Sequence, residues 1–194
     1  NESNEAEDKT NIDETLVIST AMIILVAGYD TTAMTMSYVF YQMALNPEIQ
    51  NRLQGEIDEA CTSAGNKMPE YSTIQEMEFL DMVLHEALRF YSPAGFTSRA
   101  VDKPYKVPGS EFVMPVGSEV HIPIYGFHRD ERYYATPNEF NPEHFTKEAK
   151  EKRNQFAFLA FGQGPRNCIG MRFALLEAKM GLIAILSKYN VVKC

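Results

Sequence analysis

FGQGPRNCIG, residues Phe161–Gly170, places a lone cysteine, Cys168, between a glycine-rich bend and the start of a helix. An apolar segment (FAFLA) precedes this stretch, and the run MRFALLEAKMGLIAIL, with helical spacing, follows it. Backbone N–H groups and the positive end of the helix dipole favour the thiolate form of a cysteine at such a terminus. Arg166 adds a cation, and Gly164 and Gly170 allow the backbone to approach a ligand closely. The stretch therefore predicts that Cys168 is a thiolate, serving as a nucleophile or as a metal ligand.

Other chemistries that use cysteines or glycine-rich loops do not fit this sequence. No Lys-Ser/Thr follows the glycines, which excludes a phosphate-binding loop. Cys61, Cys168 and Cys194 lie far apart, so neither the Cys-x-x-Cys spacing of metal sites nor a disulfide framework is expected. A cysteine hydrolase would need one of the four histidines as its base, and nothing in the sequence selects one.

The composition is that of a globular domain, with 194 residues, 45% of them apolar and 23% charged. The net charge of -8 argues against nucleic acid as a partner, because a phosphate-binding surface needs a basic surplus. No stretch is expected to reach the roughly 18 apolar residues of a membrane span, and no signal peptide is expected. The polar start (NESNEAEDKTNIDE) and the end just after a helix lead us to expect that both ends are cut.

Hydrophobic periodicity and turn residues predict helices joined to one region of short strands. The expected elements are a helix over 13–46, a helix over 47–60, a helix over 73–90, short strands within 94–124 (among them EFVMP and SEVHIPI), an irregular meander over 126–155 and a last helix over 171–189.

Two further stretches carry polar residues in apolar surroundings. AGYDTT, Ala27–Thr32, sets an acid and an alcohol inside the long helix, which predicts either a local opening toward a ligand or a kink with a solvated aspartate. EALR, Glu86–Arg89, places two opposite charges on one helix face. Such pairs are common on surfaces, but the apolar flanks FLDMVL and FYSP favour a buried pair.

Together these motifs resemble the cytochrome P-450 family of haem-thiolate monooxygenases. The family's cysteine loop is Phe-x-x-Gly-x-Arg-x-Cys-x-Gly, and FGQGPRNCIG matches every position. AGYDTT resembles the family's oxygen-activating helix and EALR resembles its Glu-x-x-Arg pair, in the same order along the chain. The resemblance covers the whole chain. It implies a mainly α fold with a small β-sheet subdomain, equivalent to the C-terminal half of the cytochrome P-450 fold.

The same resemblance divides a partial haem-thiolate monooxygenase domain, 1–194, into functional parts. These are the oxygen-activating helix (13–46), the Glu-x-x-Arg helix (73–90), the small β region (94–124), the meander (126–160) and the cysteine loop with the last helix (161–189).

The resemblance implies a haem b cofactor whose iron takes its axial thiolate from Cys168. Arg166 and Arg99 match positions that pair with the haem propionates, a contact that suits the arginine fork. The other positions implied to contact the cofactor are Ala27, Phe161, Gly164 and Gly170.

Asp30 and Thr31 match the family's acid–alcohol pair, whose implied role is catalytic, the delivery of protons beside bound oxygen. The positions implied to line the substrate are Ile23, Ala27, Thr31, Ala94, Gly95 and Phe96. Glu86 and Arg89 would be structural. The family joins to them an arginine from a Pro-Glu-Arg-Phe stretch, but residues 142–145 read PEHF here, so that His144 stands in its place with a shorter side chain.

The implied reaction inserts one oxygen atom of O2 into a small apolar substrate. Electrons would come from an NADPH-dependent cytochrome reductase, with a cytochrome b-type donor as a second source. HEALRFYSPAG is similar to microsomal, xenobiotic-metabolising members, which implies the cytoplasmic face of the endoplasmic reticulum membrane and an anchor N-terminal to these residues. Two alternatives stay open: a haem-thiolate isomerase or dehydratase, which Asp30-Thr31 argues against, and a truncated product without haem.

Overall fold

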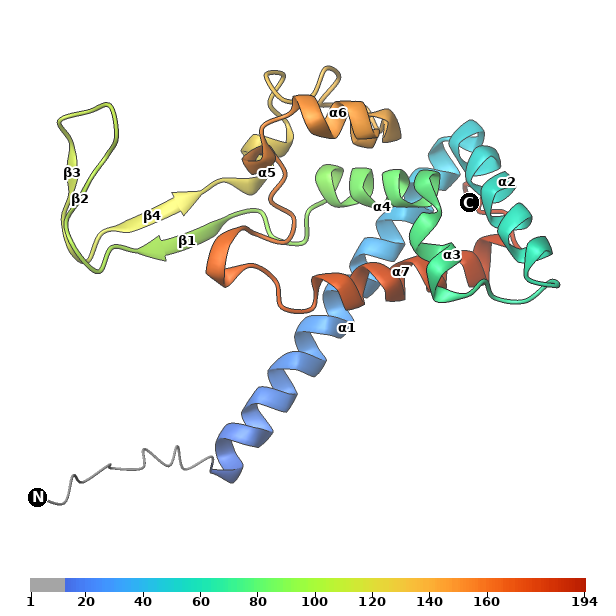
Figure 1. Ribbon diagram of the computed structural model, residues 1–194, viewed down its shortest axis with the longest axis horizontal. Coiled ribbons are helices and arrows are strands. Elements are labelled where there is room, and N and C mark those ends of the chain that lie inside the picture. The colour runs from blue at the N-terminus through green and yellow to red at the C-terminus, as the bar shows by residue number, and fades with distance from the viewer. Residues whose placement is uncertain (1–12) are drawn as a thin grey trace, which may run out of the picture.

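The structure, a computed structural model, describes residues 13–194 (Figure 1). It is mainly helical with two small antiparallel strand pairs, as the sequence predicts. Its elements in chain order are α1 (Glu14–Leu45), α2 (Pro47–Ser63), α3 (Tyr71–Glu76), α4 (Glu78–Phe90), β1 (Thr97–Ala100), β2 (Tyr105–Lys106), β3 (Val113–Met114), β4 (Glu119–Ile122), α5 (Ile124–His128), the 3-10 helix η1 (Pro142–Phe145), α6 (Lys147–Lys152), the 3-10 helices η2 (Gln155–Ala157) and η3 (Gly164–Arg166), and α7 (Met171–Leu186).

The long helix α1 begins and ends where local signals place it. The Asp13 carboxylate accepts a hydrogen bond from the Leu16 N–H at 2.7 Å and so satisfies one free donor of the first turn. At the other end Asn46 interrupts the helix and Pro47 starts α2. The α-helix is continuous through AGYDTT, so the local opening considered for this stretch is not found.

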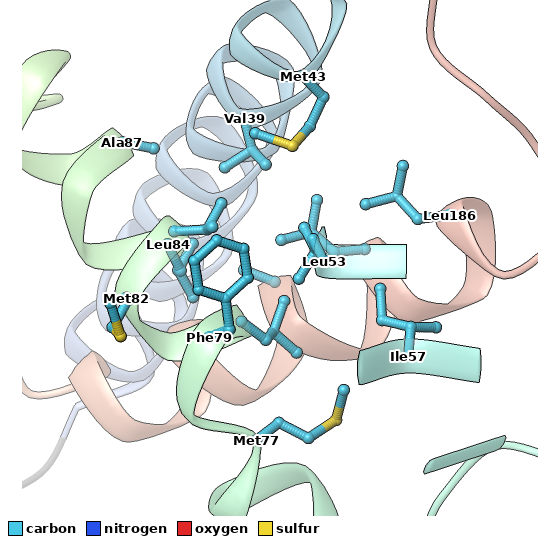
Figure 2. Packing of buried hydrophobic residues seen from close by; sticks show 14 of the residues in the cluster. Val39, Met43, Leu53, Ile57, Met77, Phe79, Met82, Leu84, Ala87 and Leu186 are labelled. Atoms are coloured by element: carbon cyan, nitrogen blue, oxygen red, sulfur yellow. The ribbon is translucent and has the colours of Figure 1, made fainter. Parts of the chain in front are cut away.

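The core lies between the C-terminal half of α1 and the helices α2, α4 and α7. Figure 2 shows Val39 and Met43 of α1 facing Leu53 and Ile57 of α2, all four with no exposed surface. Val39 and Met43 are four residues apart and therefore share one helix face. Complete burial of an aliphatic side chain of this size contributes about 1.5–3 kcal/mol, so this cluster holds the helices together.

The prediction of a single helix over 73–90 is wrong. The backbone of Met77 is extended (ψ 95°) and separates α3 from α4. The cause lies on a different helix. The Glu56 carboxylate of α2 accepts hydrogen bonds from the N–H groups of Phe79 and Leu80, at 2.9 and 2.8 Å. These donors belong to the first turn of α4 and have no partner within it. A side chain remote in sequence thus caps α4.

The strands form two separate antiparallel pairs, β1 with β4 and β2 with β3. In the larger pair Thr97 lies opposite Ile122 and Ala100 opposite Glu119. Only parts of the predicted segments EFVMP and SEVHIPI are strands, β3 and β4. The predicted irregular meander also contains the short helices η1 and α6, and the last helix ends at Leu186 rather than at residue 189.

The N-terminal half of α1 projects away from every other element described (Figure 1). Its side chains are apolar on several sides, and Ile23, Leu25 and Tyr29 are 68%, 69% and 73% exposed. By length and composition α1 could cross a membrane, since an 18-residue window has mean hydropathy 1.6, and 6% of that window is buried. The expectation that no stretch reaches this length is therefore wrong. A core helix of a larger domain has the same composition, and the buried C-terminal half of α1 fits that description.

This exposed surface leads to a first prediction. Residues 1–194 expressed alone are expected to self-associate and to hold haem weakly or not at all, because an apolar face of this extent is stable only when covered. Light scattering after gel filtration and the haem content measure both properties. Replacing Ile23 and Leu25 together by serine should shift the chain toward monomer. A wild-type monomer with one thiolate-ligated haem per chain would contradict the prediction.

Candidate functional site

The cysteine loop is a closed turn held by backbone hydrogen bonds. The Cys168 N–H donates to the Phe161 carbonyl at 2.8 Å, and the Gly162 N–H donates to the Leu159 carbonyl at 2.9 Å. Gly162 (φ 69°) and Gly164 (φ 76°) adopt the left-handed region, which disfavours residues with a Cβ. These glycines allow the chain to fold back so that the cysteine side chain stands exposed on the loop.

The last helix begins after the cysteine rather than at it. Gly170 is the N-cap residue of α7, and the first helical residue is Met171. Cys168 therefore lies just before the first turn, between the bend and a helix that starts at the predicted residue, Met171. The free N–H groups of the first turn of α7 begin at Met171, three residues after the cysteine.

A cavity of about 380 Å³ lies beside the cysteine loop. Its walls come from α1, α4, α7, the segment before β1 and the cysteine loop, so elements remote in sequence meet there. The predicted site residues that line it are Thr31, Ala94, Phe96, Arg99, Phe161, Arg166 and Cys168.

The remaining predicted residues lie outside the lining of this cavity. Ile23, Ala27 and Asp30 are on the exposed part of α1, and Gly95 and Gly170 are on adjoining turns. Gly164 lines a second cavity of about 380 Å³, which also includes Arg99.

Two arginines supply the positive charge of the cavity. Arg99 lies on β1, opposite Val120 of β4, and its guanidinium donates to the Thr97 hydroxyl at 3.0 Å and to the Ser98 carbonyl at 2.7 Å. Arg166 ends η3, and within residues 13–194 no carboxylate pairs with it. Both side chains therefore have donors that could bind an anionic group in the cavity.

The α1 wall of the cavity is a cluster of three threonines. The Thr31 hydroxyl donates to the Ala27 carbonyl at 2.7 Å, and the Thr35 hydroxyl donates to the Thr31 carbonyl at 2.8 Å. The Thr32 hydroxyl is buried and has no hydrogen-bond partner within the described residues. Sequence reasoning named only Thr31, although the spacing of Thr35, one turn later, places it on the same face.

Most of the remaining wall is apolar and was not predicted. It includes Leu84 and Leu88, one helical turn apart on α4, together with Ile124, Leu159, Ala160, Ala174, Leu175 and Ala178. Leucine and alanine at helical spacing do not distinguish a cavity wall from a packed core, so the sequence carried no signal for these residues.

Comparison of the sequence with known proteins places the chain in a family. The sequence model described as cytochrome P450 matches residues 1–194. The chain belongs to the cytochrome P450 family. It is similar to cytochrome P450 9e2 of Blattella germanica (41% identity, 94% of this chain and 34% of the relative) and to cytochrome P450 3A1 of Rattus norvegicus (40%, 100% and 38%). Cytochrome P450 6B2 of Helicoverpa armigera is 43% identical over 93% of this chain and 36% of its own length. The chain thus spans about a third of the length of the relatives it matches.

In cytochrome P450 proteins a cysteine thiolate holds the haem iron. The side chains of the cavity fit such a group: one exposed thiol, two arginines for the carboxylates of the porphyrin, and an apolar wall for its ring. Cys61 does not compete for this role, because partial burial and then the charge of Asp58 raise the pKa of its thiol.

The Glu86–Arg89 pair of this P450 chain is fully buried, as its apolar flanks predict. The carboxylate and guanidinium form two hydrogen bonds of 2.7 Å. Arg89 also donates to the carbonyls of His128, Pro137 and Glu139, at 2.7–2.9 Å. Thus α4 is tied to α5 and to the meander through a single side chain.

His144 joins the pair in the place where the family has an arginine. Its Nδ1 lies 3.2 Å from Glu86 Oε1, and its Nε2 lies 3.3 Å from the Thr136 hydroxyl. A cation is also near: Arg153 donates to the His144 carbonyl at 2.7 Å and lies 4.6 Å from the centre of the Tyr134 ring. The imidazole contacts the carboxylate, while Arg153 supplies a positive charge behind it.

Another carboxylate on α4 connects three helices. Asp81 lies 2.9 Å from Lys179 of α7, 3.3 Å from Lys150 of α6 and 3.2 Å from His85 of its own helix. Burial by itself raises the pKa of Asp81, but hydrogen bonds and charges from His85 and Lys179 outweigh it and hold the pKa well below its usual range. Asp81 is therefore the ionised partner of Lys179, whose side chain is 3% exposed.

Proposed function

We propose that the protein acts as a haem-thiolate monooxygenase. The observation that carries this proposal is the convergence of Cys168, Arg99, Arg166 and Thr31 on one cavity, although they come from three separate parts of the chain: α1, β1 and the cysteine loop. A thiolate, two cations and an alcohol beside an apolar wall match the needs of haem ligation and of proton transfer at the same site.

In this proposal each residue has a separate task. Cys168 would provide the thiolate that holds the haem iron, and its backbone N–H, bonded to the Phe161 carbonyl, holds the turn that presents the side chain. Arg99 and Arg166 would bind the propionates, and the apolar wall from α4 and α7 would exclude water from the ring. The haem, when bound, supplies the activation of O2 with electrons delivered by a partner.

Thr31 is proposed to control a proton through its Oγ1. Because the Thr31 proton is donated to the Ala27 carbonyl, the lone pairs of the oxygen are free to accept a hydrogen bond from a water in the cavity. Asp30, exposed on the same helix, is proposed as the group through which protons reach this water. The two residues would act as one relay, with the acid away from the cavity and the alcohol on its wall.

Substrate and partners follow from the same site. The apolar lining favours a small apolar substrate held near Ala94 and Phe96. An NADPH-dependent cytochrome reductase is proposed as the electron donor, with a cytochrome b-type protein as a second one. The proposed location is the cytoplasmic face of the endoplasmic reticulum membrane.

The reduced, CO-bound absorption spectrum of the full-length protein tests the proposal, since it reports thiolate ligation directly. Consumption of O2 that depends on NADPH and reductase should accompany it. A thiolate-type spectrum in a protein that turns substrate over without reductase would instead identify an isomerase or dehydratase. Absence of the thiolate band would reject haem-thiolate chemistry altogether.

Replacing Thr31 by alanine should leave haem binding intact and divert electrons to hydrogen peroxide, because the cavity water loses its acceptor. We expect a fall of about tenfold in product formed per NADPH, equal to about 1.4 kcal/mol in the coupled step. Ser37 provides a matched control, because its hydroxyl also donates back along α1, to Ala33 at 2.8 Å, but it is outside the cavity lining. Equal coupling in Thr31→Ala and Ser37→Ala would reject the relay.

A further inference from the structure

His128 is a buried histidine to which the proposed function assigns no task. It ends α5 and has no exposed surface. Its Nδ1 lies 3.1 Å from the Arg89 carbonyl, and its Nε2 accepts a hydrogen bond from the Leu159 N–H at 2.9 Å. Nε2 must therefore be the bare nitrogen and Nδ1 must carry the proton. The ring thus forms a bridge between the Arg89 carbonyl and the Leu159 N–H, and it has one defined tautomer.

The protonation state of the ring agrees with this geometry. Burial lowers the pKa of His128 to about 4, and the hydrogen bond to the Arg89 carbonyl offsets only part of that effect. The imidazole is thus neutral at neutral pH, with one donor and one acceptor. Phe158 stacks against it, with the ring centres 5.3 Å apart and the planes inclined by 14°, so the ring cannot turn without disturbing the core.

One side of the bridge is rigid. The Arg89 guanidinium donates to the His128 carbonyl at 2.7 Å, while the His128 ring contacts the Arg89 carbonyl, so the two residues are joined twice. Arg89 is itself bound to Glu86 in the fully buried pair. The position of the imidazole is therefore set by the helix α4.

The other side of the bridge leads to the cysteine. Leu159 lies two residues before Phe161, whose carbonyl accepts from the Cys168 N–H at 2.8 Å. The Leu159 carbonyl also accepts a hydrogen bond from the Gly162 N–H at 2.9 Å, so both backbone polar groups of Leu159 have partners. Leu159, Phe161 and Cys168 all line the main cavity. A displacement of the Leu159 amide would thus be passed on to the turn that carries the sulfur.

We propose that His128 is a positioning residue for the Cys168 thiolate, which it holds in register with the Glu86–Arg89 pair through the Leu159 amide. The proposal rests on the haem-thiolate function. Loss of the Nε2 acceptor leaves the Leu159 N–H buried without a partner, and the segment then gains a hydrogen bond only by moving. The sulfur of Cys168 is expected to change position, even where the protein stays folded.

Two substitutions in the full-length protein distinguish the effects of the two hydrogen bonds that the His128 ring makes. In His128→Gln the side-chain amide reaches the position of Nε2 and can accept from Leu159. In His128→Asn the shorter amide reaches only the position of Nδ1 and can replace the contact with Arg89. The readouts are the share of the thiolate-type band in the reduced CO spectrum, the haem reduction potential and the melting temperature.

We expect His128→Gln to keep the wild-type spectrum and His128→Asn to show at least a threefold larger share of the non-thiolate band. His144 is the matched control, a second buried histidine that contacts Glu86 and Thr136 rather than the cysteine segment. His144→Asn should lower the melting temperature without changing the spectrum. If His128→Asn also loses stability only, the proposal is wrong.

A measurement on the unsubstituted protein covers the case in which His128→Asn does not fold. Nitrogen NMR of the diamagnetic ferrous–CO form should show a His128 ring protonated at Nδ1 and hydrogen-bonded at Nε2. A proton on Nε2 would overturn the bridge. A wild-type protein without the thiolate band would instead reject the proposed function, and the ring tautomer would still decide whether the bridge exists.

Discussion

Replacing Cys168 by alanine in the full-length protein is expected to abolish the thiolate-type band of the reduced CO spectrum. The sulfur is the only group of the cavity lining that can ligate haem iron as a thiolate, and no cluster of other metal-binding side chains exists within residues 13–194. The protein should still fold, because the Cys168 side chain is exposed and contributes nothing to the core. The absorption spectrum and the haem content measure the effect.

The other cysteines provide the controls. Cys61 is partly buried at the edge of the core and Cys194 is the exposed last residue, and neither lines the cavity. Alanine at either position should leave the spectrum unchanged. A thiolate band that persists in Cys168→Ala and disappears in one of these two variants would move the ligand assignment to that residue.

Breaking the Glu86–Arg89 pair should have the second large effect, the loss of haem-containing protein. In Arg89→Ala the Glu86 carboxylate stays buried without its two hydrogen bonds of 2.7 Å, and three backbone carbonyls lose a donor. Leaving one buried charge unpaired costs about 3–5 kcal/mol. A domain has about 5–15 kcal/mol of stability in total, so this cost removes a large share of it, and the three carbonyls left without a donor add to the loss. Soluble yield and haem content measure this.

Arg52 and Glu143 offer a control pair in solvent, joined by a single hydrogen bond. Their atoms approach to 2.6 Å, but the side chains are 59% and 50% exposed. A surface ion pair contributes about 0–1 kcal/mol, so Arg52→Ala should express with normal haem content. If Arg89→Ala also yields soluble protein with full haem and little activity, the pair acts in catalysis rather than in folding.

Local signals made part of this structure predictable. Asp13 caps the start of α1 and Pro47 starts the next helix, and together they place the ends of α1 within one residue of the prediction. The cysteine loop is equally local, because the left-handed glycines and the closing hydrogen bond from Cys168 lie within eight residues. The family resemblance rests on this loop together with AGYDTT and EALR, three short segments, and needed no tertiary information.

Interactions between distant segments account for what was missed. The carboxylate of Glu56 creates the break at Met77, and no residue near the break indicates it. The role of His128 depends on Leu159, thirty-one residues away. A one-dimensional pattern shows such a histidine as an isolated residue, and its partner is set by how α4, α5 and the meander pack. The contact of His144 with Glu86, fifty-eight residues away, was expected only through the family resemblance.

The ion pairs of Asp81 with Lys179, Lys150 and His85 restrict which substitutions this sequence can accumulate. Lys179 is almost completely buried, so a neutral residue in place of Asp81 would leave its ammonium group buried without a carboxylate. A neutral residue at position 179 would remove a contact that keeps Asp81 ionised. Each single substitution is therefore expected to lower stability, most of all at Asp81, because Asp81 keeps His85 and Lys150 as partners when Lys179 is lost. A joint change to two apolar residues removes both charges together. Lys150 is 43% exposed and can vary on its own. Among descendants of this chain, positions 81 and 179 should therefore change together or stay as they are, while position 150 drifts freely.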